Sequence, residues 1–199
     1  MTKLITFEGI EGVGKSTQIE MLNSFIVDSG YSSQILREPG STRFGEDVRN
    51  LLLNSDHDIS SNSELLLMFA ARSELVNAFL KETKTDFILC DRFYDASIAY
   101  QGYGRGLDLK FINSLINFIN CPEPDITFLL DLDPAEGFKR KSSDKMDRIE
   151  SSGLEFFDRV RNGYLNQAHA NPQRIKVLDA SKNVTSINLK IIEFAKIFL

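Results

Sequence analysis

The chain has 199 residues, 42% of them hydrophobic, which is enough to bury one core, and no Pro/Gly/Ser-rich stretch divides it, so we expect a single domain spanning residues 1–199. A net charge of −5 disfavours a broadly basic face for nucleic acid. Without a leader, an apolar run of about 18 residues, or paired CxxC cysteines, the chain is expected to be cytoplasmic, with no nucleic-acid or membrane partner.

Five short apolar runs, each bounded by polar or turn residues, predict β-strands at residues 3–8, 33–37, 86–91, 125–131 and 174–178. Longer stretches with helical spacing of apolar residues lie between them. This alternation predicts an α/β fold with a five-stranded parallel sheet covered by helices on both faces. Ligands in such folds bind at the carboxyl ends of the strands.

Three helices carry more detailed signals. The first should end at Gly30, a residue type that commonly terminates helices. Residues 61–64, Ser-Asn-Ser-Glu, read as a capping box, and the following residues 65–71 are apolar nearly all round, which predicts burial on every side. The last helix should place Ile187, Ile191, Phe194 and Phe198 on one buried face.

Directly after the first predicted strand, residues 9–16 match the phosphate-loop pattern G-x-x-x-x-G-K-[S/T]. Glycines at these positions let backbone N–H groups surround phosphate oxygens at a helix N-terminus. Lys15 would bring its charge to the β- and γ-phosphates, and the Ser16 hydroxyl would bind Mg²⁺. An ordinary glycine turn is the alternative, which the preceding strand and following helix disfavour. The predicted nucleotide contacts are Gly9, Ile10, Glu11, Gly12, Val13, Gly14, Lys15, Ser16 and Thr17.

Two other predicted strands end in charged residues. The strand at 86–91 ends in Asp91, from which an acidic side chain can help to hold Mg²⁺, and Arg92 follows it. Asp91 could instead be a solvated acid at a strand end. The strand at 33–37 ends in Arg37, and the Glu38-Pro39-Gly40 that follows could be a plain turn. Asp91 and Arg92 together would suit a metal and two phosphates at one edge of the sheet.

Seven segments occur in the order found in bacterial thymidylate kinases, which the chain resembles over nearly its whole length. They are EGIEGVGKST (8–17), REPGSTRFGEDVRNLLL (37–53), LLLMFAAR (65–72), DRFYDASIAYQGYGRG (91–106), LLDLDP (129–134), KRKSSDKMDRIE (139–150) and LDAS (178–181). The most specific are REPG and DRF…AYQG…GRG. The resemblance implies a P-loop kinase and a homodimer that transfers the γ-phosphoryl group of ATP to dTMP with Mg²⁺, giving dTDP and ADP. The alternative is another nucleoside or nucleotide kinase of the same fold.

The resemblance also implies roles for individual residues. The implied catalytic residues are Lys15, Arg140, Glu11 and Arg92, and the implied Mg²⁺ ligands are Ser16, Asp91 and Glu11. The implied dTMP contacts are Arg37, Glu38, Pro39, Phe69, Arg72, Arg92, Ser97, Tyr100 and Gln101. In this assignment Arg92 and Arg37 hold the dTMP phosphate, while Tyr100 crowds the 2′ position of the sugar.

The thymine base should meet Arg72, with Ser97 or Gln101 completing the polar contacts. The family usually stacks an aromatic residue on thymine one turn before this arginine, where the chain has Met68 followed by Phe69. We expect Phe69 to take this role, with core packing as the alternative. For Arg72 the alternative is a surface or ion-paired arginine, which the apolar flanking residues disfavour.

Residues 139–150 form the implied lid over the phosphates. Some relatives carry an arginine in the phosphate loop itself, but this chain has Gly12 there and would need a cation from the lid. Arg140 is the first candidate, with Lys141 and Lys145 as supplements, because the arginine fork can bridge two phosphate oxygens. A solvated basic helix face is the alternative.

Overall fold

The computed structural model describes residues 2–54, 58–81, 83–141 and 147–199. Its strands are β1 (Lys3–Glu8), β2 (Ser33–Arg37), β3 (Phe87–Asp91), β4 (Ile126–Asp131) and β5 (Ile175–Asp179). They form one sheet in the order β2-β3-β1-β4-β5, and every neighbouring pair is parallel. The predicted five-stranded parallel sheet is confirmed, with no strand boundary off by more than one residue.

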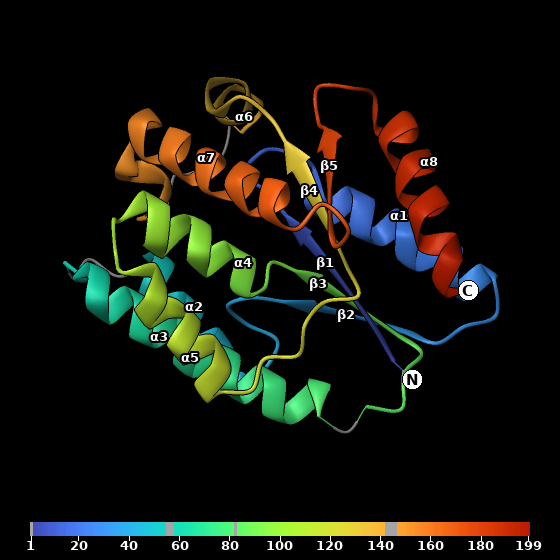
Figure 1. Ribbon diagram of the computed structural model, residues 1–199, viewed down its shortest axis with the longest axis horizontal. Coiled ribbons are helices and arrows are strands. Elements are labelled where there is room, and N and C mark those ends of the chain that lie inside the picture. The colour runs from blue at the N-terminus through green and yellow to red at the C-terminus, as the bar shows by residue number, and fades with distance from the viewer. Residues whose placement is uncertain (1, 55–57, 82, 142–146) are drawn as a thin grey trace.

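Helices cover both faces of this sheet (Figure 1), as predicted. One face carries α1 (Lys15–Asp28) and α8 (Val184–Ala195), and the other carries α4 (Tyr94–Ser97) and α7 (Leu154–Ala170). The remaining helices are α2 (Arg43–Asn54), α3 (Ser61–Leu75), α5 (Leu109–Phe118), α6 (Pro134–Arg140), the π-helices η1 (Val76–Leu80) and η2 (Ile98–Gly104), and the short 3₁₀ turns η3 (Glu150–Ser152) and η4 (Lys196–Phe198).

The main core lies around the central strands. Ile5 and Phe7 of β1 and Phe128 of β4 are fully buried, and the Phe7 and Phe128 rings lie 5.4 Å apart. Burial on both faces explains why these strands read as continuous apolar runs, since a parallel sheet has no solvated side. The sheet therefore forms a rigid base, and its strand ends hold the polar residues described below.

Two of the helix signals are confirmed. Helix α1 ends before Gly30, whose φ of 89° is left-handed, and the Tyr31 N–H donates back to the Ile26 carbonyl as in a glycine-terminated helix. On α8, Ile187 and Ile191 are buried. Phe194 and Phe198 pack against the same core, as the spacing predicts.

The predictions for α3 need two corrections. Its N-cap is Ser60, whose hydroxyl accepts a hydrogen bond from the Ser63 N–H, so the predicted capping box at 61–64 is wrong. Glu64 instead points into a buried polar cluster, because donors from distant segments meet it there. Leu66 is 53% exposed while Leu65 is buried, so this helix is not enclosed on every side. No helix among the described residues has the length and apolar character to cross a membrane.

Candidate functional site

The phosphate loop joins β1 to α1, as its sequence pattern requires. Gly9, Gly12 and Gly14 all have positive φ, which only glycine adopts without strain, and α1 begins at Lys15. The Lys15 ammonium is folded back onto the Gly9 and Ile10 carbonyl oxygens, at 3.2 and 3.0 Å. Burial and the nearby Arg92 lower the pKa of Lys15. The loop thus has the shape of an anion-binding cradle at a helix N-terminus.

Two connected cavities lie beside this loop. The phosphate cleft is lined by residues 11–17, by Arg37, Glu38, Arg49, Asp91 and Arg92, and by Lys141, Asp147 and Glu150. The inner pocket is lined by Glu11, Glu38, Pro39, Arg49, Leu53, Met68, Arg72, Arg92, Ala96, Ser97, Tyr100, Gln101, Asp147 and Ile149. Charged residues, including Glu11 and Arg92, line both cavities. A molecule bound in the inner pocket would therefore lie next to a molecule bound in the phosphate cleft.

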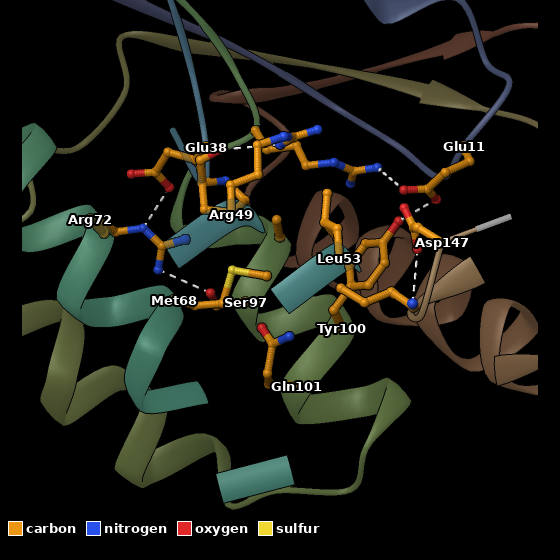
Figure 2. Close-up of a pocket in the computed structure, with 14 residues that line it drawn as sticks. Glu11, Glu38, Arg49, Leu53, Met68, Arg72, Ser97, Tyr100, Gln101 and Asp147 are labelled. Carbon is orange, nitrogen blue, oxygen red and sulfur yellow. Dashed lines mark hydrogen bonds and ion pairs between the residues drawn. The ribbon is translucent and has the colours of Figure 1, made fainter. Parts of the chain in front are cut away.

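Glu11, Arg92 and Tyr100 form one hydrogen-bonded group, in which Glu11 and Arg92 line both cavities; Figure 2 shows Glu11 beside Tyr100. Arg92 donates to Glu11 Oε1 at 2.6 Å, and the Tyr100 hydroxyl donates to Glu11 Oε2 at 2.7 Å. The Arg92 guanidinium also lies over the Tyr100 ring, 4.9 Å from its centroid. Burial acts to raise the pKa of Glu11, but Arg92 and Lys15 outweigh it and hold that pKa below its usual value. Glu11 is therefore an ionised group beside the phosphate loop.

A second carboxylate, Glu8, is linked to Arg92 through the Tyr164 hydroxyl. The sequence analysis gave Glu8 no role. It is fully buried at the end of β1, where it accepts hydrogen bonds from the Phe93 N–H and the Tyr164 hydroxyl, both at 2.7 Å. Tyr164 in turn accepts from Arg92 at 3.2 Å. Burial, together with Asp95, raises the pKa of Glu8 to about 8. These contacts hold Arg92 in a left-handed backbone conformation, with φ of 68°.

Arg72 lies at the far end of the inner pocket and is 3% exposed. It donates to Glu38 Oε2 at 2.7 Å, to Ser97 Oγ at 3.0 Å and to the Phe93 carbonyl at 3.2 Å. Glu38 Oε1 is buried without a partner among the described residues. Figure 2 shows the Glu38–Arg72–Ser97 chain along one wall of the pocket. Arg72 is ion-paired with Glu38 and also lines the pocket. The ion pair that was considered as an alternative to a base contact therefore does not remove Arg72 from the pocket wall.

Phe69 does not line the inner pocket, so its assignment as the base-stacking residue is corrected. Its ring is 4% exposed and packs with Leu65 and Ile112, and the Arg72 guanidinium lies 4.8 Å from its centroid. Met68 lines the pocket instead. Adjacent residues on a helix point about 100° apart, and of these two Met68 is the one that faces the cavity.

The arginines on the phosphate side differ from the expected set. Arg49 of α2 lines both cavities and donates to the Pro39 carbonyl at 3.1 Å, although the sequence analysis assigned it no role. Arg37 lines the phosphate cleft but not the inner pocket, and it is paired with Glu46 through two contacts of 3.0 Å. Arg49 lies in the middle of α2, which spans Arg43–Asn54. The packing of this helix against the rest of the protein, rather than a local sequence pattern, turns Arg49 toward the site.

The residues expected to bind Mg²⁺ suit that ion chemically. Asp91 and Ser16 line the phosphate cleft together with Glu11, and Asp91 Oδ1 is buried without a partner in the described part of the chain. Mg²⁺ prefers oxygen ligands and is commonly held by one or two carboxylates plus substrate phosphates. In the same residue ranges, no cluster of three or more His, Cys, Asp or Glu side chains could hold a metal alone. A site completed by phosphate oxygens fits both observations.

The implied lid begins at the end of α6. Arg140 donates to the Ala180 carbonyl at 3.0 Å and does not line the phosphate cleft. Lys141 lines the cleft and is paired with the buried Glu150. Lys145 lies outside the described residues. Of the two candidates in the described part of the lid, Arg140 and Lys141, only Lys141 lines the phosphate cleft.

Comparison with known proteins identifies the family of the chain. A family model described as thymidylate kinase matches residues 7–191. The thymidylate kinases of Prosthecochloris aestuarii and Chlorobium phaeobacteroides are 46% and 44% identical, covering 95% and 96% of this chain and 91% and 93% of their own. A crystal structure of thymidylate kinase from Ehrlichia chaffeensis is 34% identical, covers 98% of both chains and superposes with a TM-score of 0.81. The chain therefore belongs to the thymidylate kinase family.

Proposed function

We propose that this protein phosphorylates dTMP to dTDP at the junction between the phosphate cleft and the inner pocket, using ATP as the donor. Membership in the thymidylate kinase family is the evidence for this reaction. The observation that carries the site assignment is that Glu11 and Arg92 line both cavities, so that a donor phosphate at the loop and an acceptor phosphate in the pocket would meet beside them. The rate then comes from alignment and charge neutralisation.

On the donor side, the loop amides and Lys15 would hold the ATP phosphates. The Lys15 ammonium now bonds to loop carbonyls, and phosphate oxygens would replace them as its partners. Asp91, Ser16 and Glu11 would hold Mg²⁺ together with phosphate oxygens. When bound, the ion would neutralise charge on those oxygens.

On the acceptor side, Arg92 and Arg49 would hold the dTMP phosphate, with Arg37 at the outer edge. Arg72, Ser97 and Gln101 would face the base, and Met68 would supply an apolar wall. Glu38 would orient Arg72 through their ion pair. Pro39, the next residue along the chain, lines the same pocket. Tyr100 would lie against the sugar, fixed by its bond to Glu11.

The transfer step needs no side-chain nucleophile or general base, because the acceptor phosphate is already an anion at neutral pH. A lid cation would approach the transferring group from the side of α6. Lys141 is placed for this role in the described conformation, and Arg140 would have to leave Ala180 to take it.

We also propose that the protein is a homodimer, as the family resemblance implies. Leu51 of α2 and Leu66 of α3 are 42% and 53% exposed, and these two helices pack against each other. Contiguous exposed apolar patches mark subunit contacts, and these two leucines would belong to such a patch. Sedimentation velocity should give a dimer for the wild type and a shift toward monomer for Leu66→Glu. A monomeric wild type would contradict the proposal.

A substrate panel tests the function. Coupled measurement of ADP release with dTMP, dUMP, dCMP, dGMP and thymidine should give the highest kcat/KM for dTMP. Thymine and uracil differ by one methyl group, worth about 1–3 kcal/mol, so dUMP should be a poor but measurable substrate and dCMP a worse one. Preference for dCMP, dGMP or thymidine would instead indicate another kinase of the same fold.

A further inference from the structure

The orientation of Gln101 in the inner pocket depends on a residue that does not line the pocket. Gln101 belongs to η2, and its Nε2 donates to Glu64 Oε1 at 3.0 Å. Glu64 belongs to the first turn of α3, and both residues are 1% exposed. The two side chains therefore form a buried pair that links the pocket to the helix beside it.

Glu64 is held as an ionised carboxylate by two arginines from distant segments. Arg148 donates to its Oε2 at 2.5 Å, and Arg105 donates to the two oxygens at 3.2 and 3.3 Å. Burial acts to raise the pKa of Glu64, but the hydrogen bonds from Gln101, Arg105 and Arg148 outweigh it and lower that pKa. An ionised carboxylate has acceptor sites only.

This acceptor decides which end of the Gln101 amide faces the pocket. The two ends of an amide have nearly the same shape, so an unconstrained glutamine can present either one. A flipped Gln101 would place its oxygen against the Glu64 oxygen and lose a buried hydrogen bond. Gln101 Oε1 accepts no hydrogen bond from the described residues and is not enclosed by them, so it opens to the pocket. Figure 2 shows the side chain reaching from its helix toward Met68 and Ser97.

A donor lies on the same wall. Three of the five N–H groups of Arg72 donate to Glu38, Ser97 and Phe93, and the other two have no hydrogen-bond partner among the described residues. Ser97, which bonds to Arg72, precedes Gln101 by four residues and so lies one turn before it. The pocket therefore presents an N–H donor from Arg72 near a carbonyl acceptor from Gln101.

Pyrimidines differ in the edge that would meet this pair. Thymine and uracil carry the O4 acceptor beside an N3–H donor. Cytosine carries the reverse pattern, an amino donor at C4 beside an N3 acceptor. With the observed amide orientation thymine would form both hydrogen bonds, whereas cytosine would place like groups against each other.

We propose that Glu64 is a positioning residue that sets the base specificity of the inner pocket: by accepting from Gln101 Nε2 it turns the Gln101 carbonyl oxygen toward the base and selects pyrimidines with an N3–H. This inference rests on the proposed function. Glu64 acts through Gln101 and touches no substrate itself.

The variant Glu64→Gln tests this role. A glutamine can donate as well as accept, so either orientation of Gln101 then finds a partner. The ratio of kcat/KM for dCMP to that for dTMP should rise by at least about tenfold, since a mispaired polar edge is what rejects dCMP. The ratio of dUMP to dTMP should change by less than about twofold, because both bases present the same edge. Unchanged dCMP discrimination in a folded, active Glu64→Gln protein would overturn the proposal.

Two controls separate orientation from general loosening. Arg105→Met removes two of the bonds to Glu64 but keeps the Gln101 contact and an apolar stem over Phe156, so its dCMP to dTMP ratio should match wild type. In a Gln101→Met background, Glu64→Gln should no longer change that ratio. An equal rise in Arg105→Met, or in the Gln101→Met background, would assign the effect to structural loosening and refute the role.

The result remains decisive if Glu64→Gln does not fold. Glu64→Asp then gives the test: its carboxylate is one methylene shorter and withdraws from Gln101 Nε2, so the ratio of kcat/KM for dCMP to that for dTMP should rise by at least about tenfold, and an unchanged ratio would overturn the proposal. The wild-type panel is measured first. A wild type that prefers dCMP would refute the proposed function, whereas a dTMP-preferring wild type with an unresponsive Glu64→Gln variant would refute this inference alone.

Discussion

Gly12 of the phosphate loop lies against the backbone of Gly137 in α6: a Cβ atom built on Gly12 would be 2.2 Å from the Gly137 carbonyl oxygen. The Gly12 φ of 75° is also one that other residues rarely adopt. The loop and the helix that leads into the lid therefore touch through their backbones. An arginine at position 12, as some relatives carry, would require α6 to move.

The first prediction follows from this contact. Gly12→Ala should lower the free energy of unfolding by more than Gly14→Ala, because a Cβ on Gly14 would meet no atom within 4 Å and would add backbone strain alone. Such strain costs about 1–3 kcal/mol, and the Gly12 variant adds the clash with α6. Urea unfolding of both variants measures the difference. Equal losses would mean that α6 moves aside without cost.

The second prediction concerns Glu8 and pH. The pKa of Glu8 is raised from an ordinary value of 4.5 to about 8, so its neutral form is favoured in the folded protein. Stability from this group is complete below pH 4.5 and is lost as pH rises toward 8. Glu8→Gln stays neutral, so between pH 5 and pH 9 its free energy of unfolding should gain at least about 1.4 kcal/mol relative to wild type, the equivalent of a pKa difference of one.

Glu11→Gln provides the matched control for Glu8. The pKa of Glu11 is lowered, so its stabilising contribution is present above about pH 4.5 and is lost only in acid. Chemical unfolding across pH 5–9 should therefore show a constant offset between Glu11→Gln and wild type. A constant offset for Glu8→Gln as well would mean that Glu8 is ionised throughout this range.

The third prediction separates the ring of Tyr100 from its hydroxyl. Tyr100→Ala should raise the use of ribo-TMP relative to dTMP, because the ring is proposed to fill the space of a 2′-hydroxyl. Tyr100→Phe keeps the ring and removes only the bond to Glu11, so sugar selection should persist while kcat falls. Steady-state kinetics with both nucleotides measures the ratios. The same ratio in Tyr100→Ala as in wild type would exclude Tyr100 from sugar selection.

The fourth prediction compares Arg140 and Lys141, the two candidate lid cations that lie in the described part of the chain. Cations that stabilise the transferring phosphoryl group contribute about 10³–10⁵ in kcat, so removing the acting one should cost at least roughly 10²-fold. Lys141→Ala should show this loss with little change in KM for dTMP, and Arg140→Ala should lose less, because Arg140 is bonded to Ala180. The opposite order would show that Arg140 swings into the cleft during turnover.

The fifth prediction concerns Lys15. Lys15→Ala should nearly abolish ADP release while the far-ultraviolet circular dichroism spectrum stays as in wild type, since within the described ranges the ammonium bonds to two loop carbonyls and no other group. Near-normal turnover in a folded variant would remove the phosphate loop from the proposed mechanism.

Local sequence determined the sheet and the loop. The three central strands β1, β3 and β4 are buried along most of their length, so their apolar runs marked them, and the edge strands β2 and β5 were readable from shorter apolar runs between polar residues. The phosphate loop could also be predicted, because its glycines, Lys15 and Ser16 all lie within the eight consecutive residues 9–16. Which of these strands would be neighbours was not readable, since their pairing joins segments far apart in the sequence.

Tertiary structure decided the details of the site. Met68 and Phe69 are adjacent and both apolar, and only the packing of α3 shows which one faces the pocket. Arg49 lies in the segment 37–53 that carries the family resemblance but was given no role there, and α2 brings it to the phosphate cleft. Glu64 fits a local capping pattern, yet its hydrogen bonds go to residues 37, 41 and 84 positions away. Buried charged groups must be paired, and they pair with the groups that packing brings close to them. A sequence pattern shows only partners that are close along the chain, so it cannot identify these long-range pairs.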